Sequence, residues 1–149
     1  FYFLIYLLFY RKPRDDCAVQ SWDFFTKAFE LPRSNCYNLM NSIFLNTHNV
    51  KKGGSVYLEK TDSVIYISGS SFINTISEQT GGSIFLDIKQ SDISNCCFNN
   101  CSSKLSASSL SVKSQDDLID NLLSESAITF CSCNSSTVQL LRGQQSLFS

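Results

Sequence analysis

The chain has 149 residues, which fits one domain, and its seven cysteines are too few for a small disulfide-dominated scaffold. Twelve basic and thirteen acidic residues leave a net charge of −1, so the chain has neither the basic footprint of a nucleic-acid binder nor a polybasic membrane patch. Serine and asparagine are abundant while only 17% of residues are charged, a bias typical of β-rich extracellular proteins.

The chain opens on a wholly apolar run, FYFLIYLLFY, that stops at Arg11. Ten residues are too few to cross a bilayer as a helix, which takes about 20 residues, and they match the apolar core of a secretory signal peptide. No basic segment precedes the run and no small-residue cleavage site closely follows it. We interpret residues 1–14 as a signal-like or anchor remnant that could associate with a membrane through residues 1–10; a buried apolar end is the alternative. Because residue 1 is Phe, we expect the chain to be a fragment.

Residues 15–35 are predicted to form an amphipathic helix that caps the domain. Large apolar side chains recur there at spacings of three and four, after two aspartates and before a proline. These side chains are Val19, Trp22, Phe25 and Phe29. An aromatic stripe of this kind could dock a ligand, but its usual role is to cover a neighbouring apolar surface, and we adopt that interpretation.

The rest of the chain is built from repeats. A shift of 28 residues places SIFLNT (42–47) on SSFINT (70–75) and GGSVYL (53–58) on GGSIFL (81–86). Shifts of a further 26 and 32 residues give a third and a fourth copy, with the extra residues of the fourth absorbed near 116–120. The period is marked by four phenylalanines: Phe44, Phe72, Phe98 and Phe130.

Within each period the apolar residues alternate in short bursts, as in Val56 and Leu58, which predicts strands rather than helices. Three bursts per period, separated by Gly, Ser, Asn or Asp, leave no room for a crossover helix. We therefore predict an all-β fold, a right-handed parallel β-helix of three to four coils over residues 36–141, with stacked coils about 4.8 Å apart. Residues 137–141 would form a last short strand, and residues 142–149 a truncated tail.

The repeat assigns structural roles to three rows of residues. The four phenylalanines would stack inside the coil, and an aliphatic row would form from Val56, Ile84 and Leu110. An interior amide ladder is expected from Asn46, Asn74 and Asn100. A corner that needs positive φ or close backbone approach is expected at Gly53, Gly54, Gly81 and Gly82. The third copy has Ala107 and Ser108 at that corner.

These motifs resemble the repeats of the polymorphic outer membrane proteins, which pair a Gly-Gly-Ala-aliphatic element with a Phe-x-x-Asn element on a pectin-lyase-like β-helix. Here Gly-Gly-Ser-Val (53–56) and Gly-Gly-Ser-Ile (81–84) each follow a Phe-x-Asn element. The resemblance covers about residues 36–141 and departs in two details, because serine replaces the alanine and threonine or cysteine ends the Phe element. It implies a secreted or surface-exposed, adhesin-like protein, and it brings no catalytic residue.

Pectin-lyase-like folds also serve polysaccharide lyases and hydrolases, so individual sites must decide whether this chain is an enzyme. Glu59 and Asp87 fall on one rung, near the carboxyl separation of retaining glycosidases, but Lys113 follows on the next coil and makes the row a surface charge ladder. The single histidine, His48, lies in a turn without a nucleophile on its rung. We predict no catalytic residue, no cofactor and no metal site.

Five of the seven cysteines lie within residues 96–133, but their spacing lacks the paired knuckles of a zinc site. Cys101 and Cys133 share a rung in the 32-residue register, where parallel side chains hold the sulfurs apart, so buried free thiols are favoured over a disulfide. Cys17 and Cys36 could pair if the protein is secreted.

Two surface features could carry function. The sequon at Asn134 is a candidate glycosylation site, whereas Asn100, which heads a second sequon, should be inaccessible in the interior ladder. Tyr57 and Phe85 stack on the outside of neighbouring coils, where they could present an aromatic strip to a glycan or a protein. Packing between surface strands is the simpler role for this pair.

We therefore expect a non-enzymatic, adhesin-like β-helix module, extracellular or at the cell surface. It would bind a host or matrix protein or a glycan along its strand faces, and no nucleic acid. Two alternatives stay open, namely a fragment of a pectin-lyase-like carbohydrate-active enzyme and a structural spacer.

Overall fold

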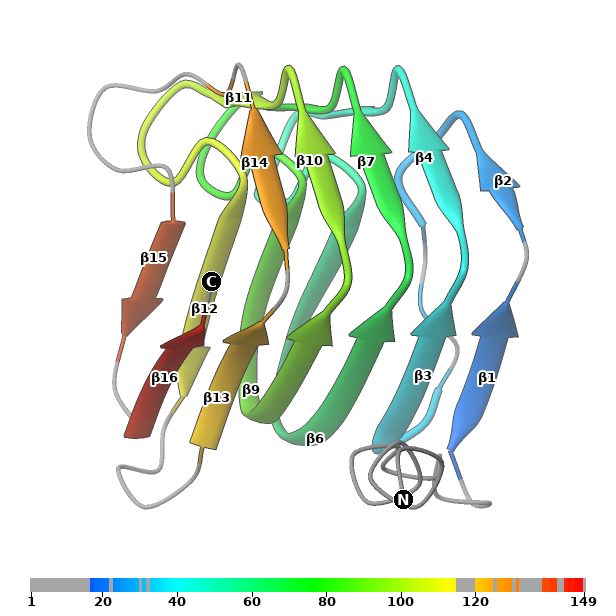
Figure 1. Cartoon of the computed structure of the whole chain (residues 1–149), viewed down its shortest axis with the longest axis vertical. Coiled ribbons are helices and arrows are strands. Elements are labelled where there is room, and N and C mark those ends of the chain that lie inside the picture. The colour runs from blue at the N-terminus through cyan, green and yellow to red at the C-terminus, as the bar shows by residue number, and fades with distance from the viewer. Residues whose placement is uncertain are drawn as a thin grey trace, which may run out of the picture.

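The computed structural model describes residues 17–21, 23–29, 31, 33–114, 120–124, 126–129, 131, 138–141 and 144–148. Over these residues the chain forms a parallel β-solenoid of about three turns, with its coils stacked side by side (Figure 1). Every strand pairing in this part is parallel, because successive coils run in the same direction. The predicted all-β solenoid is thereby confirmed.

Three parallel sheets form the faces of the solenoid. The eight-stranded sheet contains β1 (Ala18–Ser21), β3 (Cys36–Met40), β6 (Val56–Ser68), β9 (Ile84–Ser94), β12 (Leu110–Ser114), β13 (Asp120–Ser124), β15 (Val138–Leu141) and β16 (Gln144–Phe148). The five-stranded sheet contains β2 (Phe24–Phe25), β4 (Ile43–Leu45), β7 (Ser71–Ile73), β10 (Cys97–Asn99) and β14 (Ala127–Thr129). The three-stranded sheet contains β5 (His48–Asn49), β8 (Ile76–Ser77) and β11 (Ser102–Ser103).

The long strands β6 and β9 bend, so that one strand serves two faces of the coil (Figure 1). Their register shifts at the bend, where Lys60 pairs with Ile88 but Val64 pairs with Gln90. Two extra residues of β6 are accommodated there, and Thr61 and Asp62 are both exposed. This bulge explains why the first repeat is 28 residues long and the second only 26.

The core contains the phenylalanine and aliphatic rows that the repeat predicts. The rings of Phe44 and Phe72 stack with centroids 4.9 Å apart, and those of Phe72 and Phe98 with centroids 5.0 Å apart. All three side chains are fully buried. The aliphatic row of Val56, Ile84 and Leu110 is also fully buried and in register. Burial of such side chains contributes about 1.5–3 kcal/mol each, so these rows supply much of the stability.

The predicted helix over residues 15–35 is wrong where the structure describes it, because this segment contains strands β1 and β2. Phe25 stacks on Phe44 with a centroid distance of 4.7 Å and so extends the phenylalanine row by one coil. Phe29 contacts Phe25 and bridges to Val56. Phe25 and Phe29 both pack against the core, on either side of a turn. Their spacing of four residues therefore resembles a helical period although no helix is present there. Trp22 lies outside the described residues.

The register of the fourth copy also needs a correction. Phe98 pairs with Ile128, a shift of 30 residues rather than 32. Ile128 therefore takes the place predicted for Phe130, which lies outside the described residues, as do Cys133 and residues 115–119. The sequence alignment paired Phe98 with Phe130, whereas the structure pairs Phe98 with Ile128 and so places Cys131 beside Cys101.

The asparagine row forms a ladder, but on the surface rather than in the interior. Asn74 donates to Asn46 Oδ1 at 3.0 Å, and Asn100 donates to Asn74 Oδ1 at 2.8 Å. All three side chains are exposed, and all three backbones have φ between 52° and 54°. In this left-handed conformation, which asparagine tolerates well, the chain turns the corner and breaks the alternation that would have pointed the amides inward.

The glycine corner is confirmed by its backbone. Gly53 and Gly81 have φ of 63° and 71°. At Gly54 a Cβ atom would lie 2.1 Å from Gly82 O, so neighbouring coils approach too closely for a side chain. In the third coil Ala107 keeps the corner conformation with φ of 56°.

The two ends of the chain are described only in part. The strand predicted over residues 137–141 is confirmed as β15, which pairs with β12. It is not the last strand, because part of the predicted tail forms β16, which pairs with β13. Residues 1–14 lie outside the described part of the chain. Among the described residues, no helix is long and apolar enough to span a membrane.

Candidate binding groove

A groove of about 550 Å³ lies on the strand face where the first coil meets β6, and we call it the Tyr57 groove. Its lining residues are Ala28, Phe29, Leu31, Asn49, Lys51, Tyr57, Leu58, Glu59 and Lys60. One wall is apolar and the other carries an amide, a carboxylate and two ammonium groups. A few polar groups placed around an apolar wall is the usual composition of a small-ligand site.

The first coil forms the apolar wall. Phe29 N donates to Ser55 O at 2.7 Å, which holds residues 28–31 beside the beginning of β6. Because Phe25 packs against Phe29 and stacks on Phe44, the solenoid core anchors this wall. Sequence reasoning placed these residues on a helix and so missed the groove. The only sequence signal for the extra coil is the apolar spacing around Phe25, which a helix also explains.

Tyr57 lies at the centre of the polar wall. One face of its ring packs on Phe85, with centroids 5.9 Å apart, while the ring also lines the groove on the side of the preceding coil. Its hydroxyl donates to Glu59 Oε2. This hydrogen bond, followed by burial, raises the pKa of Tyr57 to about 12, so the phenol stays protonated at neutral pH.

Three lysines lie in or beside the groove. Lys52 Nζ lies 4.4 Å from the centroid of the Phe85 ring and 3.9 Å from Glu59 Oε1. Lys60 donates to Ser34 O at 2.9 Å and to Asn35 Oδ1. The ammonium group of Lys60 thus donates hydrogen bonds to two neutral oxygen atoms. Lys51 lines the groove and is exposed.

The predicted aromatic strip is mostly a packing contact. Phe85 is only 6% exposed, and Lys52 lies over its ring. The row ends at Ser111, which pairs with Phe85 on the next coil. Tyr57 is therefore the member of this row that a ligand in the groove could contact.

Glu59, Asp87 and Lys113 form a charge ladder, as expected. Glu59 pairs in register with Asp87, and Asp87 with Lys113. Lys113 Nζ lies 3.2 Å from Asp87 Oδ2, and the Asp87 carboxylate is buried. Each carboxylate is thus compensated by a neighbouring lysine, because Glu59 also faces Lys52. Among the described residues, no group of three or more His, Cys, Asp or Glu could hold a metal ion.

His48 lies in a surface cluster on the three-stranded sheet. Its Nε2 atom lies 2.8 Å from Glu78 Oε1, and Lys104 pairs with the other oxygen of the same carboxylate. The hydrogen bond from Lys104 and, to a smaller extent, the hydrogen bond with His48 lower the pKa of Glu78. The cluster is a surface ion-pair network without a nucleophile among its three members.

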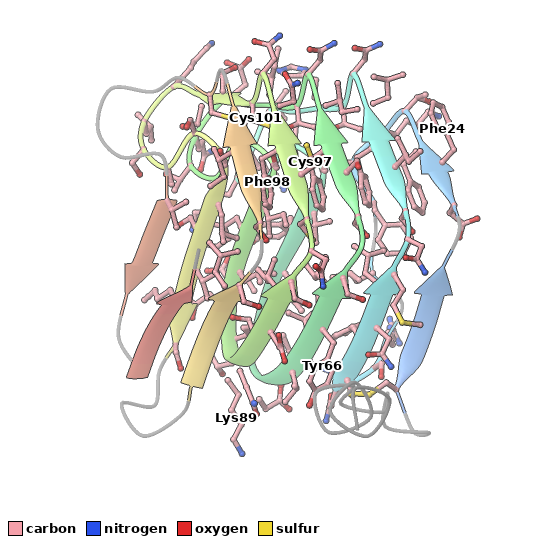
Figure 2. All side chains as sticks on the ribbon, viewed as in Figure 1. Phe24, Tyr66, Lys89, Cys97, Phe98 and Cys101 are labelled. Carbon is pink, nitrogen blue, oxygen red and sulfur yellow. A yellow bond between two sulfur atoms is a disulfide. The ribbon has the colours of Figure 1, made fainter. Side chains whose placement is uncertain are left out.

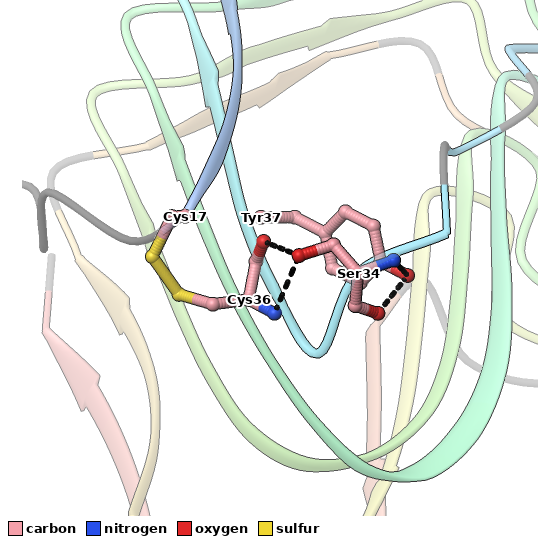
Figure 3. Close-up of a disulfide and its surroundings, with 4 residues drawn as sticks. All are labelled: Cys17, Ser34, Cys36 and Tyr37. Carbon is pink, nitrogen blue, oxygen red and sulfur yellow. Dashed lines mark hydrogen bonds between the residues drawn. A yellow bond between two sulfur atoms is a disulfide. The ribbon is translucent and has the colours of Figure 1, made fainter.

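Cys17 and Cys36 form a disulfide (Figure 3). The bond joins β3 to the residue that precedes β1, and it closes a loop of 19 residues across the first coil. Beside it, Ser34 Oγ donates to Cys36 O at 2.8 Å, and Tyr37 donates through its hydroxyl to Ser34 O at 2.5 Å. The disulfide and this turn hold the first coil, and with it the apolar wall of the groove, against β3.

Four further cysteines among the described residues are not in a disulfide: Cys96, Cys97, Cys101 and Cys131. Burial raises the pKa of Cys96 to about 12. The hydrogen bond to Cys131, followed by burial, raises the pKa of Cys101. At neutral pH both groups are thiols rather than thiolates, which makes them poor nucleophiles.

In Figure 2 the side chains of Phe24, on the first coil, and of Lys89, at the bend of β9, point away from the core. The candidate glycosylation site Asn134 lies outside the described residues.

Comparison of the chain with protein-family models, with curated proteins and with solved structures finds no significant match.

Proposed function

We propose that this protein is a non-enzymatic β-solenoid module, secreted or displayed at the cell surface, that binds a glycan in the Tyr57 groove. The observation that carries the proposal is a groove lined by an aromatic residue, Tyr57, that is hydrogen-bonded to the carboxylate of Glu59, together with one asparagine and two lysines. A sugar presents an apolar C–H face that packs on an aromatic ring, and hydroxyl groups that bond to side chains of this kind.

The size of the groove favours a sugar over a protein partner. A stable protein interface buries about 800 Å² on each partner around a hydrophobic core. The Tyr57 groove is lined by nine residues, about half of them polar or charged. A protein that docks by a larger surface is the competing outcome of the binding test below.

Two features support an extracellular location. The Cys17–Cys36 disulfide is of a kind that persists in oxidising compartments. The paired Gly-Gly-Ser and Phe-x-Asn elements support kinship with the polymorphic outer membrane proteins, and so an adhesin-like role on a right-handed, pectin-lyase-like β-helix. In this proposal the Gly-Gly-Ser corner serves the fold and the groove serves binding.

The side-by-side carboxylates of Glu59 and Asp87 are the one observation that favours a carbohydrate-active enzyme instead. Their compensation by Lys52 and Lys113 argues against that role, because a general acid needs a raised pKa and no cation beside it. A structural spacer would bind no glycan.

A glycan array probed with the labelled full chain tests the proposal. We expect a defined class of glycans to bind, and Tyr57→Ala to weaken that binding by at least 10-fold, which corresponds to about 1.4 kcal/mol. Tyr66→Ala is the matched control, because Tyr66 lies on the same strand, is partly buried and does not line the groove.

Binding that is equal in both variants, or no glycan binding at all, would contradict the proposal. Incubation of the chain with a bound glycan separates the module from an enzyme. Cleavage by the wild-type chain that Glu59→Gln abolishes would favour the carbohydrate-active enzyme.

A further inference from the structure

Cys101 and Cys131 face each other on neighbouring coils. Phe98 pairs with Ile128, and the same 30-residue shift places Cys131 beside Cys101. Cys101 N donates to Cys131 Sγ at 3.4 Å, and Cys131 donates from the same sulfur to Phe98 O at 3.8 Å. The sulfur of Cys131 therefore lies over the backbone of the coil that carries Cys101.

The first coil contains a disulfide with the same relation between its cysteines. Ala18 pairs with Tyr37 in the parallel ladder, so Cys17 and Cys36 are also in-register neighbours on adjacent coils. Their Cα atoms lie 4.5 Å apart and their sulfurs are bonded. Cysteines in register on adjacent coils of this solenoid can therefore be joined by a disulfide. The spacing of about 4.8 Å between paired parallel strands lies within the Cα separation that disulfides use.

The other free thiols among the described residues have different neighbours. Cys96 donates to Ser94 O at 3.3 Å and is packed among serine residues, with Ser126 in its place on the next coil. Cys97 pairs in register with Ser71 on one side and Ala127 on the other. In the described part of the chain, Cys101 and Cys131 are the two cysteines outside the Cys17–Cys36 disulfide that lie next to each other in register.

We propose that Cys101 and Cys131 form a second disulfide that joins the third coil to the fourth. A disulfide of glutathione or of a protein oxidant is attacked by Cys131, which forms a mixed disulfide and releases one thiol. While the fourth coil is still undocked, the Cys101 thiol is in contact with water and loses its proton. The resulting thiolate attacks the Cys131 sulfur, forms the Cys101–Cys131 bond and releases the second thiol. The two cysteines lose two protons and two electrons, and the oxidant is reduced to two thiols.

Burial sets the order of these steps. Cys131 is partly exposed, whereas Cys101 is fully buried and hydrogen-bonded through Sγ to Phe72 O at 3.4 Å. The more accessible thiol meets the oxidant, and the buried thiol resolves the intermediate. Completion of the bond would be fastest while the fourth coil is still docking. The disulfide would then fix that coil on the solenoid, in the way that Cys17–Cys36 fixes the first.

Mass spectrometry of the full chain tests this proposal. The purified, reduced protein is refolded in a buffer of reduced and oxidised glutathione, alkylated and digested without reduction. We expect a peptide pair linked through Cys101 and Cys131, together with the pair linked through Cys17 and Cys36. Cys131→Ser should lose the first pair and keep the second, and Cys97→Ser is the matched control that should keep both.

Alkylation of both Cys101 and Cys131 in the refolded wild-type chain would overturn the proposal, whatever the state of Cys17 and Cys36. A bond from Cys101 or Cys131 to any other cysteine would also overturn it. The proposal rests on the proposed extracellular location only for its oxidant. Because the experiment supplies the oxidant, its failure is distinct from a failure to bind glycans.

Discussion

The corners of the first two repeats differ from the corner of the third, although the backbone is the same. Thr47 and Ser55 share a hydrogen bond of 2.7 Å, and Thr75 and Ser83 share one of the same length. In the third corner Cys101 takes the place of the threonine, and the buried hydroxyl of Ser109 has no hydrogen-bond partner.

The glycine position shows the same contrast. Gly54 and Gly82 have no side chain, whereas Ser108 takes this place in the third corner and its buried hydroxyl also lacks a partner. A buried hydroxyl without a partner costs about 1–3 kcal/mol. The left-handed backbone at Ala107 is kept nonetheless. The comparison shows that backbone stacking fixes the corner, and that the Thr–Ser pair adds stability to it.

The largest effect is expected where the corner is tightest. A Cβ atom on Gly82 would lie 1.8 Å from Ser108 O and 2.6 Å from Ser102 O, both backbone atoms of the next coil. Gly82→Ala should therefore lower the free energy of unfolding by about 3 kcal/mol, through overpacking that the backbone cannot relieve. Chemical denaturation of the purified chain measures this loss.

Gly69→Ala is the matched control for that substitution. Its Cβ atom would meet Asn41 Oδ1, the end of an exposed side chain that can move. Only the left-handed backbone, with φ of 59°, then opposes the alanine, at a cost of about 1 kcal/mol. Equal losses at both glycines would show that close approach of the coils does not determine the corner.

A smaller effect is expected from restoring the missing pair. Cys101→Thr should give Ser109 the partner that Ser55 and Ser83 already have, and should raise the free energy of unfolding by about 1 kcal/mol. Thr47 and Thr75 are fully buried on the same rung, so the rung accommodates threonine. Denaturation midpoints in a reducing buffer measure this gain without any contribution from disulfides.

The reciprocal change checks the cause of that gain. Thr75→Cys should lower the free energy of unfolding by a similar amount, because it leaves Ser83 without its partner. If Thr75→Cys has no effect while Cys101→Thr stabilises the chain, packing and not the hydrogen bond distinguishes the corners.

The smallest effect is expected on the strand face that follows each corner. The aromatic row of Tyr57 and Phe85 ends at Ser111 in the third coil. Because folding raises the pKa of Tyr57 from 10.0 to about 12, the stability that its protonated hydroxyl provides is complete below pH 10 and is lost as the pH rises to 12. Unfolding midpoints between pH 9 and pH 12 should fall more for the wild-type chain than for Tyr57→Phe. If the midpoints of the two chains fall equally over this pH range, the hydrogen bond from Tyr57 to Glu59 does not contribute to stability.

Most of the solenoid could be predicted from its repeats, because residues in equivalent positions become neighbours and must suit one another. Phe44 and Phe72, or Gly53 and Gly81, are alike in sequence because each stacks on the next. The first coil escaped prediction because it has one phenylalanine in the row, Phe25, and no glycine corner. A single inward residue looks the same in a coil as in an amphipathic helix.

The candidate site could be predicted only in part. Tyr57 and Glu59 were visible as outward members of a regular strand. Phe29 and Leu31, which complete the groove, belong to the coil that carries no repeat signal. The exposure of the asparagine ladder was missed for a different reason, since strand alternation fails at the residue where the backbone turns left-handed.

The bulge at Thr61 and Asp62 has a consequence for how such a chain can change its length. Two added residues leave the fold at a bend and project into solvent, while the buried rows on either side keep their partners. At the opposite bend the tightly apposed corner admits no such freedom. Surface residues can therefore be added at the bend that contains Thr61 and Asp62, and the groove edge can diversify without disturbing the stack that supports it.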